Sequence, residues 1–244
     1  MKKQRTLIIG ANSAIAQAIS TEVLIHGAEQ LILISRRLDV YFGDNYLGAQ
    51  KIQVTDYSEK NIQDAVNSIE NDNENSITRI FICHGILHNK VLHPEKCLEN
   101  INTASFETVL NINALTPLLW LKHLTPKLTT KHSCKITIFS ARIGSISDNN
   151  LGGWYCYRAS KAALNMMLKS ASIELARRAK NIKLIAFHPG TTDTKLSKPF
   201  QKNIPDNKLF STKFVAKQLL DIVDNTPIDG HLSYLDWQGK QIGW

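Results

Sequence analysis

The sequence predicts an α/β fold with a single doubly wound, seven-stranded parallel sheet and helices on both faces. Short, continuously apolar segments alternate along the chain with longer segments whose apolar residues recur at helical spacing. Strands that are apolar throughout, rather than at every second residue, indicate a parallel sheet buried on both faces. Neither a composition shift nor an internal repeat divides the 244 residues. We therefore expect one domain, residues 1–244.

Each element follows from a local pattern. Strands are expected at 6–9, 31–34, 51–54, 79–82, 135–139, 183–187 and 231–235. Helices are expected at 14–25, 58–69, 103–124, 155–179 and 212–224. Ser13 is the expected N-cap of the first helix, and Pro117 predicts a kink in the third. Polar residues 71–76 predict a loop.

Composition excludes several classes of protein. The four cysteines are far apart and form no CxxC pair, which argues against a zinc site or a disulfide framework and suits free thiols in a reducing cytoplasm. No apolar run reaches the length of about 18 residues needed for a membrane span. The net charge is +8, but Lys and Arg are scattered, which indicates a basic surface rather than a nucleic-acid site. We expect neither a metal, a membrane nor a nucleic acid as partner.

The turn from the first strand into the first helix has the character of a phosphate-binding loop. Residues 10–16 are small, so backbone N–H groups can approach a pyrophosphate at the positive end of the helix. A three-glycine dinucleotide signature would be more specific, but only Gly10 is present, with alanine at 14 and 16. On these residues alone, an ordinary tight turn is an equally good reading.

The end of the second strand favours NADP(H) over NAD(H). Arg36 and Arg37 stand where an Asp or Glu would take the ribose hydroxyls of NAD. A guanidinium there suits a 2′-phosphate, which it can bind through charge-assisted hydrogen bonds.

Tyr157 and Lys161 are the strongest candidates for catalysis. Four residues apart on one helix, they share a face. An ammonium beside a phenol stabilises the phenolate and lowers its pKa from about 10. The tyrosine can then serve as general acid or base on a carbonyl or an alcohol.

The order of these segments resembles short-chain dehydrogenases/reductases, a family with a Rossmann fold, over essentially the whole chain. The motifs that carry the resemblance are 10–16, Gly85, 157–161 and Pro189–Thr194. Segments 144–149, 152–155 and 236–239 are more specific and resemble the C-factor-like or sniffer-like carbonyl reductases.

The resemblance implies a role for each matching residue. Tyr157 would donate the proton, and Lys161 would lower its pKa and bind the nicotinamide ribose. Asn113, favoured over Asn111 by its spacing to Pro117, would hold a water in the proton relay. The cofactor residues implied in this way are Gly10, Asn12, Ser13 and Ile15 at the diphosphate, Arg36, Val54, His84, Gly85, Tyr157, Lys161, Pro189 and Gly190 elsewhere, and Thr192 and Thr194 at the carboxamide.

Three positions depart from the family pattern. The serine that polarises the carbonyl is Ala141 here, so Ser140 is the expected substitute, with Ser145 as the alternative. At the adenine, Gln53 stands in place of an Asp, with Asp56 displaced by three residues. His84 replaces part of an NNAG motif and is expected to pack beside the cofactor rather than act as a base.

The expected function is NADP(H)-dependent hydride transfer between the nicotinamide and a carbonyl or alcohol substrate. Residues 191–212 are long and polar and are expected to form a substrate lid. By resemblance, a homodimer or homotetramer is expected. The alternative is a non-catalytic NADP(H)-binding regulator, which the alanine at 141 favours and which Tyr157, Lys161 and Asn113 oppose.

Overall fold

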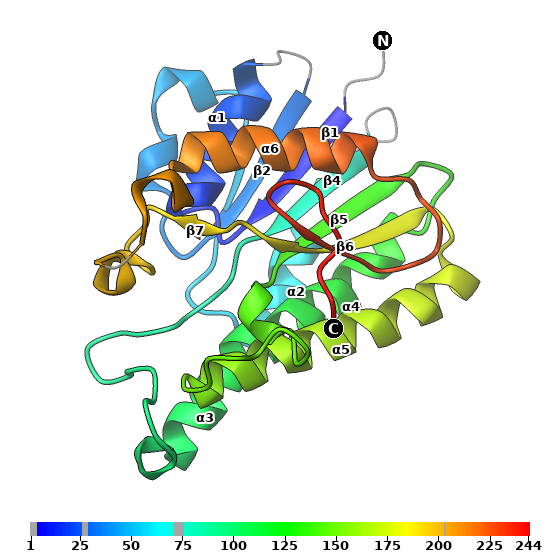
Figure 1. Ribbon diagram of the computed structural model, residues 1–244. Coiled ribbons are helices and arrows are strands. Elements are labelled where there is room, and N and C mark those ends of the chain that lie inside the picture. The colour runs from blue at the N-terminus through cyan, green and yellow to red at the C-terminus, as the bar shows by residue number, and fades with distance from the viewer. Residues whose placement is uncertain (1–3, 26–28, 71–75, 203) are drawn as a thin grey trace.

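The computed structural model describes residues 4–25, 29–70, 76–202 and 204–244. Its main sheet has seven parallel strands in the order β3-β2-β1-β4-β5-β6-β9, so the chain winds outward from β1 in both directions (Figure 1). This is the doubly wound Rossmann arrangement that the sequence predicts. The switch point lies between β1 and β4, where ligands bind in such folds.

Most elements begin and end within two residues of the expected positions. The strands of the sheet are β1 Gln4–Ile9, β2 Glu29–Ser35, β3 Gln50–Gln53, β4 Ile77–Ile82, β5 Cys134–Phe139, β6 Ile182–His188 and β9 Ser233–Asp236. The helices are α1 Ala14–Ile25, α2 Glu59–Asn67, α3 Thr103–Leu110, α4 Thr116–Leu128, α5 Tyr155–Arg178 and α6 Thr212–Asn225. Most of the loop expected at 71–76 lies outside the described residues.

Helices cover both faces of the sheet. In Figure 1, α1 and α6 run side by side on one face, while α2, α4 and α5 cover the other. Side chains along β1 alternate between these layers: Leu7 and Ile9 pack with the α2, α4 and α5 side, and Ile8 packs with the α1 and α6 side. All three are fully buried, which explains why residues 7–9 of the strand are apolar without alternation.

The helix expected at 103–124 is divided. A π-helical segment, Asn111–Leu115, separates α3 from α4. The kink expected at Pro117 is therefore wrong in its position, because Pro117 lies in the first turn of α4. Proline is tolerated there, since the first N–H groups of a helix have no intrahelical partner. The irregularity lies instead at the segment that contains Asn113.

The expected lid contains more secondary structure than its composition indicated. Two short strands, β7 Thr191–Thr192 and β8 Leu209–Phe210, pair in parallel and close the segment at its base. Single-turn helices at Lys198–Phe200 and Asp206–Lys208 lie between them. The segment is thus a folded excursion from the sheet rather than a structureless loop.

Two features bear on the expected surroundings of the protein. All four cysteines lie within the described residues and are free thiols. Within the same residues, no helix combines the length and apolar character that crossing a membrane requires.

Packing of α6 on the sheet is expected to depend on Leu219. Leu219 is fully buried against the β-sheet layer, whereas Lys217 on the same helix is exposed. We expect Leu219→Ala to lower the free energy of unfolding by about 3 kcal/mol through lost apolar burial and the cavity left behind. Lys217→Ala should change it by no more than about 0.5 kcal/mol. Urea unfolding of both variants tests this, and equal effects would contradict the packing described for α6.

Candidate active site

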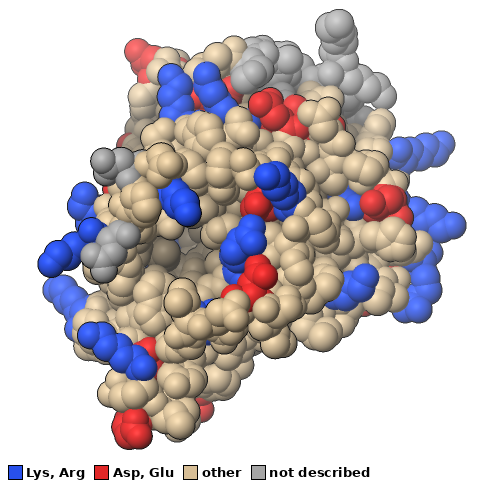
Figure 2. All heavy atoms as spheres, viewed as in Figure 1, with Lys and Arg blue, Asp and Glu red and all other residues tan. Residues whose placement is uncertain are grey.

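A cleft runs along the carboxyl ends of the central strands. It consists of two cavities of about 790 and 570 Å³. Both are bordered by one set of residues, which makes them continuous: Asn12, Ser13, Arg37, Cys83, His84 and Gly85. Figure 2 shows a hollow on this face, with Lys and Arg side chains dispersed around it rather than gathered in a patch. The cleft lies at the switch point that the sheet order predicts.

The loop between β1 and α1 forms one wall of the cleft. Gly10 has φ +74°, and a Cβ there would lie 3.1 Å from the Cys83 carbonyl oxygen. Only glycine suits that conformation and that approach. Ser13 caps α1 by accepting the Ala16 N–H at 3.2 Å, as expected. The N–H groups of Ala14 and Ile15, which have no intrahelical partner by helix geometry, lie at the cavity wall. This cradle fits the diphosphate of a dinucleotide.

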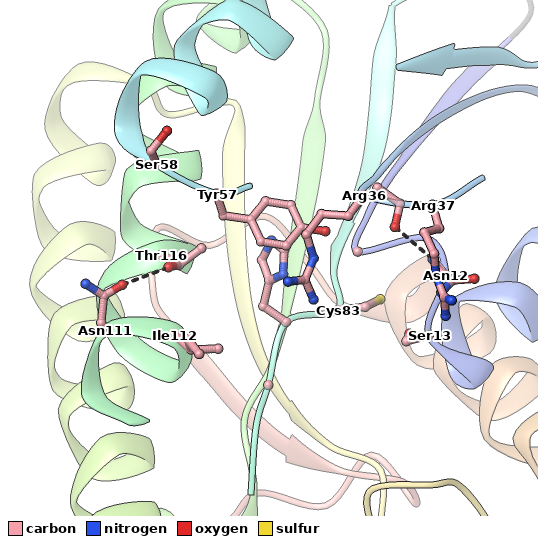
Figure 3. A pocket seen from close by; sticks show the side chains of 14 residues that line it. Asn12, Ser13, Arg36, Arg37, Tyr57, Ser58, Cys83, Asn111, Ile112 and Thr116 are labelled. Carbon is pink, nitrogen blue, oxygen red and sulfur yellow. Dashed lines mark hydrogen bonds between the residues drawn. The ribbon is translucent and has the colours of Figure 1, made fainter. Parts of the chain in front are cut away.

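Arg36 and Arg37 follow β2 and extend over the larger cavity (Figure 3). Both side chains are exposed at its rim. The guanidinium carbon of Arg36 lies 5.3 Å from the centre of the Tyr57 ring, a cation–π contact that limits its motion. Two guanidinium groups beside a phosphate-binding loop make this end of the cleft suited to a phosphate on the ribose.

His84 forms an aromatic wall rather than a charged one. Its ring lies 4.2 Å from that of Tyr57 and 6.3 Å from that of Trp120. Burial, with Arg36 and Lys161 nearby, lowers the pKa of His84 to about 3, so the ring is neutral near pH 7. Its buried Nε2 has no hydrogen-bond partner among the described residues. His84 thus packs beside the cleft as a neutral ring.

Tyr157 and Lys161 line the smaller cavity together with Ser140. Both project from the first turns of α5. The Lys161 ammonium donates to the Phe139 carbonyl oxygen at 2.8 Å and lies 5.8 Å from the centre of the Tyr157 ring. The pair shares a face, as its spacing predicts, but the lysine is bound to the end of β5.

Burial governs the ionisation of both side chains. It lowers the pKa of Lys161 to about 7. Burial, with a smaller contribution from Tyr234, raises the pKa of Tyr157 above its usual value of about 10. This is opposite to the lowering that the sequence led us to expect. In this geometry, the raised pKa keeps Tyr157 in the protonated form near pH 7.

The two candidate serines differ in position. Ser140 is buried at the cavity wall, and its hydroxyl donates to Asn165 Oδ1 at 2.6 Å. Ser145 is also buried, but its Oγ accepts the Asp148 N–H at 3.2 Å and contacts Ser147, which stabilises a turn. The cavity therefore has Ser140 on its wall and does not include Ser145.

Asn113 fixes the chain that follows β4. Its Oδ1 accepts the Ile86 N–H at 2.7 Å, and its Nδ2 donates to the Ile86 carbonyl at 2.9 Å and to Ser160 Oγ at 3.0 Å. The side chain is fully buried. Asn111 instead accepts from the Thr116 hydroxyl and lines the larger cavity. The structure thus separates the two residues: Asn113 holds the loop after β4, and Asn111 faces the cleft.

The remaining expected cofactor residues divide into two sets. The set on the cavity walls comprises Ile15, Gly85, Pro189 and Thr194. The set outside them comprises Gln53, Val54, Gly190 and Thr192. Gln53 donates to the Arg36 carbonyl at 3.2 Å and so supports the arginine loop. A Cβ on Gly190 would lie 2.6 Å from the Phe210 ring, so this glycine allows close packing beneath the lid.

Several residues of the site carry no signal that the sequence analysis used. Tyr57 lines the cleft, although it belongs to none of the motifs of the sequence. Gly144 permits the turn after β5 to pack on α5, because a Cβ there would lie 2.7 Å from Lys161 Cβ. Gly144 begins segment 144–149, which carries the resemblance to the carbonyl reductases but which was not expected to shape the site.

The segment after β7 covers the mouth of the smaller cavity. Thr194, Lys195 and Leu196 line it. His88 Nε2 lies 3.1 Å from the Leu196 carbonyl oxygen, and the Phe200 ring lies 5.6 Å from the His88 ring.

Trp154 joins this cover to the start of α5. Its ring lies 4.8 Å from that of Phe200 and 6.3 Å from that of Tyr157. Its φ of 52° is in the left-handed region, where large side chains are strained. The Glu95 carbonyl holds the Trp154 N–H at 2.6 Å, and the Glu95 carboxylate accepts the Cys156 N–H at 3.1 Å.

Comparison with known proteins agrees with this geometry. Residues 4–205 match the family model of short chain dehydrogenases. C-signal of Myxococcus xanthus is 30% identical over 148 residues, which cover 60% of this chain and 83% of that protein. Benzil reductase ((S)-benzoin forming) of Bacillus cereus is 24% identical over 244 residues, which cover 89% and 93%.

Solved structures share the fold over its full length. Carbonyl reductase Sniffer of D. melanogaster gives a TM-score of 0.84 at 19% identity, with complete coverage of both chains. The NADPH-bound carbonyl reductase from chicken fatty liver gives 0.82 at 20% identity, again with complete coverage. Sheet order, cleft and family match agree: the chain belongs to the short-chain dehydrogenase family.

Proposed function

We propose that this protein is an NADP(H)-dependent oxidoreductase that transfers a hydride between the nicotinamide and a carbonyl or alcohol substrate. One observation carries the proposal. Tyr157, Lys161 and Ser140 line a cavity that continues into the cradle of Gly10, Ser13 and Ile15. An acid, a cation and a hydroxyl thus stand at one end of a dinucleotide-sized cleft.

Bound nicotinamide would supply or accept the hydride. In the reduction, the Tyr157 hydroxyl donates its proton to the substrate oxygen as the carbonyl carbon becomes a carbinol. The Lys161 ammonium stabilises the phenolate that remains. The Ser140 hydroxyl is the donor placed to hold the substrate oxygen, once it turns from Asn165. Alcohol oxidation reverses these proton movements.

Preference for NADP(H) is supported by Arg36 and Arg37 at the end of β2. These groups would bind the 2′-phosphate, while the His84 and Tyr57 rings would pack near the adenosine. Several solved relatives of the same fold are described as bound to NADP or NADPH.

An apolar or planar carbonyl compound is the proposed substrate class. Leu196 lines the smaller cavity, and Trp154 and Phe200 form an aromatic pair beside Tyr157. We assign the segment at about 191–212 as the substrate lid, since it supplies Leu196 and Phe200. Relatives named as benzil reductases are consistent with this class.

A homodimer or homotetramer is the proposed assembly. Two neighbouring helices carry exposed apolar side chains, Phe106 on α3 and Met166 and Ile173 on α5. A second copy would cover these groups. The free thiols suit a reducing compartment such as the cytoplasm.

The proton donor is tested by Tyr157→Phe. We expect carbonyl reduction with NADPH to fall about a thousandfold, because the general acid is lost, while NADPH binding measured by fluorescence is retained. Tyr46→Phe, which removes a phenol hydroxyl away from the cleft, should leave the rate unchanged. NADPH binding without turnover on any aldehyde, ketone or quinone would favour the non-catalytic regulator.

Cofactor preference is tested by Arg36→Glu. We expect the affinity for NADPH to fall about 10-fold to 100-fold relative to NADH, because a hydrogen-bonded ion pair is replaced by repulsion. Arg178→Glu makes the same charge change at the far end of α5. If both variants reduced NADPH affinity equally, the effect would be one of net charge and not of a phosphate site at Arg36.

The pH dependence of reduction is set by Lys161. Its pKa of about 7 means that the ammonium loses its charge as the pH rises through that value. The raised pKa keeps Tyr157 protonated over the same interval. We therefore expect kcat/KM for reduction to fall as the pH rises above about 7, because a neutral lysine no longer stabilises the phenolate.

A matched variant separates this ionisation from others. Lys161→Arg keeps its charge throughout the accessible range, so any activity that it retains should lack the fall. A wild-type profile that stays flat to about pH 9 would contradict the assignment to Lys161.

A further inference from the structure

Tyr234 on β9 places a second phenol behind the catalytic wall. Its side chain is fully buried, and its hydroxyl donates to the Ala141 carbonyl oxygen at 2.7 Å. The Asn165 side chain is in hydrogen-bond contact with the same hydroxyl, and the Ser140 side chain lies close to it. No motif considered in the sequence includes Tyr234, and the mechanism above does not use it.

Together with the peptide bond between Ser140 and Ala141, these contacts form a closed ring. The Ser140 hydroxyl donates to Asn165 Oδ1 at 2.6 Å, so the Asn165 amide nitrogen is the group left to donate to Tyr234. Tyr234 in turn donates to the carbonyl of Ala141, the residue after Ser140. One phenol therefore holds both the side chain and the backbone of the Ser140–Ala141 pair at the end of β5.

Packing fixes the phenol itself. The Trp244 ring stacks on Tyr234 with centroids 5.2 Å apart and planes inclined by 28°. The Trp244 carbonyl accepts the Ser147 N–H at 3.0 Å, which ties the end of the described chain to the turn after β5. Tyr234 consequently has little freedom to move without moving Ser140.

We propose that Tyr234 is a positioning residue for proton transfer, which fixes the place of Ser140 through Asn165 and the Ala141 carbonyl, so that the Ser140 hydroxyl needs only to turn from Asn165 to reach the substrate oxygen. Ala141 has no hydroxyl of its own, so substrate polarisation on this wall rests on Ser140. The inference rests on the proposed function. It adds a residue from β9 that determines where the Ser140 hydroxyl group lies.

A double-mutant cycle tests this role in the full chain. We expect Tyr234→Phe to lower kcat about tenfold through misplacement of Ser140, with KM for NADPH unchanged. Ser140→Ala should lower kcat at least as much. Because both changes remove one function, Tyr234→Phe should have no further effect in the Ser140→Ala background.

Controls separate positioning from loss of stability. Thr226→Val removes another buried hydroxyl bond, to the Ile222 carbonyl at the end of α6, and should leave kcat unchanged. Asn165→Ala opens the ring at a second point and should reproduce the kinetics of Tyr234→Phe. This variant replaces Tyr234→Phe in the test if Tyr234→Phe does not fold. Effects that multiply fully in the double variant, or a Tyr234→Phe kcat within about twofold of wild type, would overturn the inference.

The outcomes also distinguish this inference from the function on which it rests. Loss of turnover in Tyr157→Phe together with multiplicative effects in the cycle would remove the role of Tyr234 alone. Full turnover in Tyr157→Phe would remove the proposed function, and the role of Tyr234 with it.

Discussion

Lys161, near the start of α5, is buried against the end of β5, and the rest of the site depends on this burial. Its ammonium binds the Phe139 carbonyl, and its backbone lies against Gly144. A lysine in that place requires a glycine at 144, a free carbonyl at the end of the strand, and a helix that begins close to the sheet. Each of these conditions also brings Tyr157 and Ser140 to the same wall.

Burial disfavours the charged forms of both Lys161 and Tyr157. Desolvation makes the ammonium easier to deprotonate and the phenol harder to ionise. Near pH 7 the pair is therefore less ionised than its spacing along the helix suggests. A ligand that donates a hydrogen bond to the phenol oxygen and accepts one from the ammonium would change this balance, because it would restore part of the solvation that both groups have lost.

Much of the fold could be predicted because local sequence patterns determine its strands and helices. The apolar runs of β1 and β4 and the amphipathic α6 lie within two residues of the expected ranges. The division of the third helix could not, because a π-helical segment has no distinct hydrophobic period. The strand pair within residues 191–212 is likewise set by tertiary contact rather than by composition.

The site was predictable where sequence spacing determines geometry, and less so elsewhere. Tyr157 and Lys161 share a helix face, and Arg36 follows a strand that ends at the cleft, so both could be placed in advance. The choice between Ser140 and Ser145 depends on how the chain turns after β5. Tyr57 and Tyr234 reach the cleft and its wall from distant segments, and only the three-dimensional path of the chain brings them there.

The π-helical segment at Asn111–Leu115 shifts the direction of the side chains between α3 and α4, which precede it and follow it without a break in the helical path. Because each helical residue advances the side-chain direction by about 100°, the extra residue rotates α3 relative to α4 about their common path. α4 can then keep Trp120 and Leu124 on the sheet, while α3 turns its own face toward α5. Asn113 sits at the joint, where it reaches Ile86. The segment therefore lets each helix keep its own packing, while the Asn113 side chain within it holds the loop after β4.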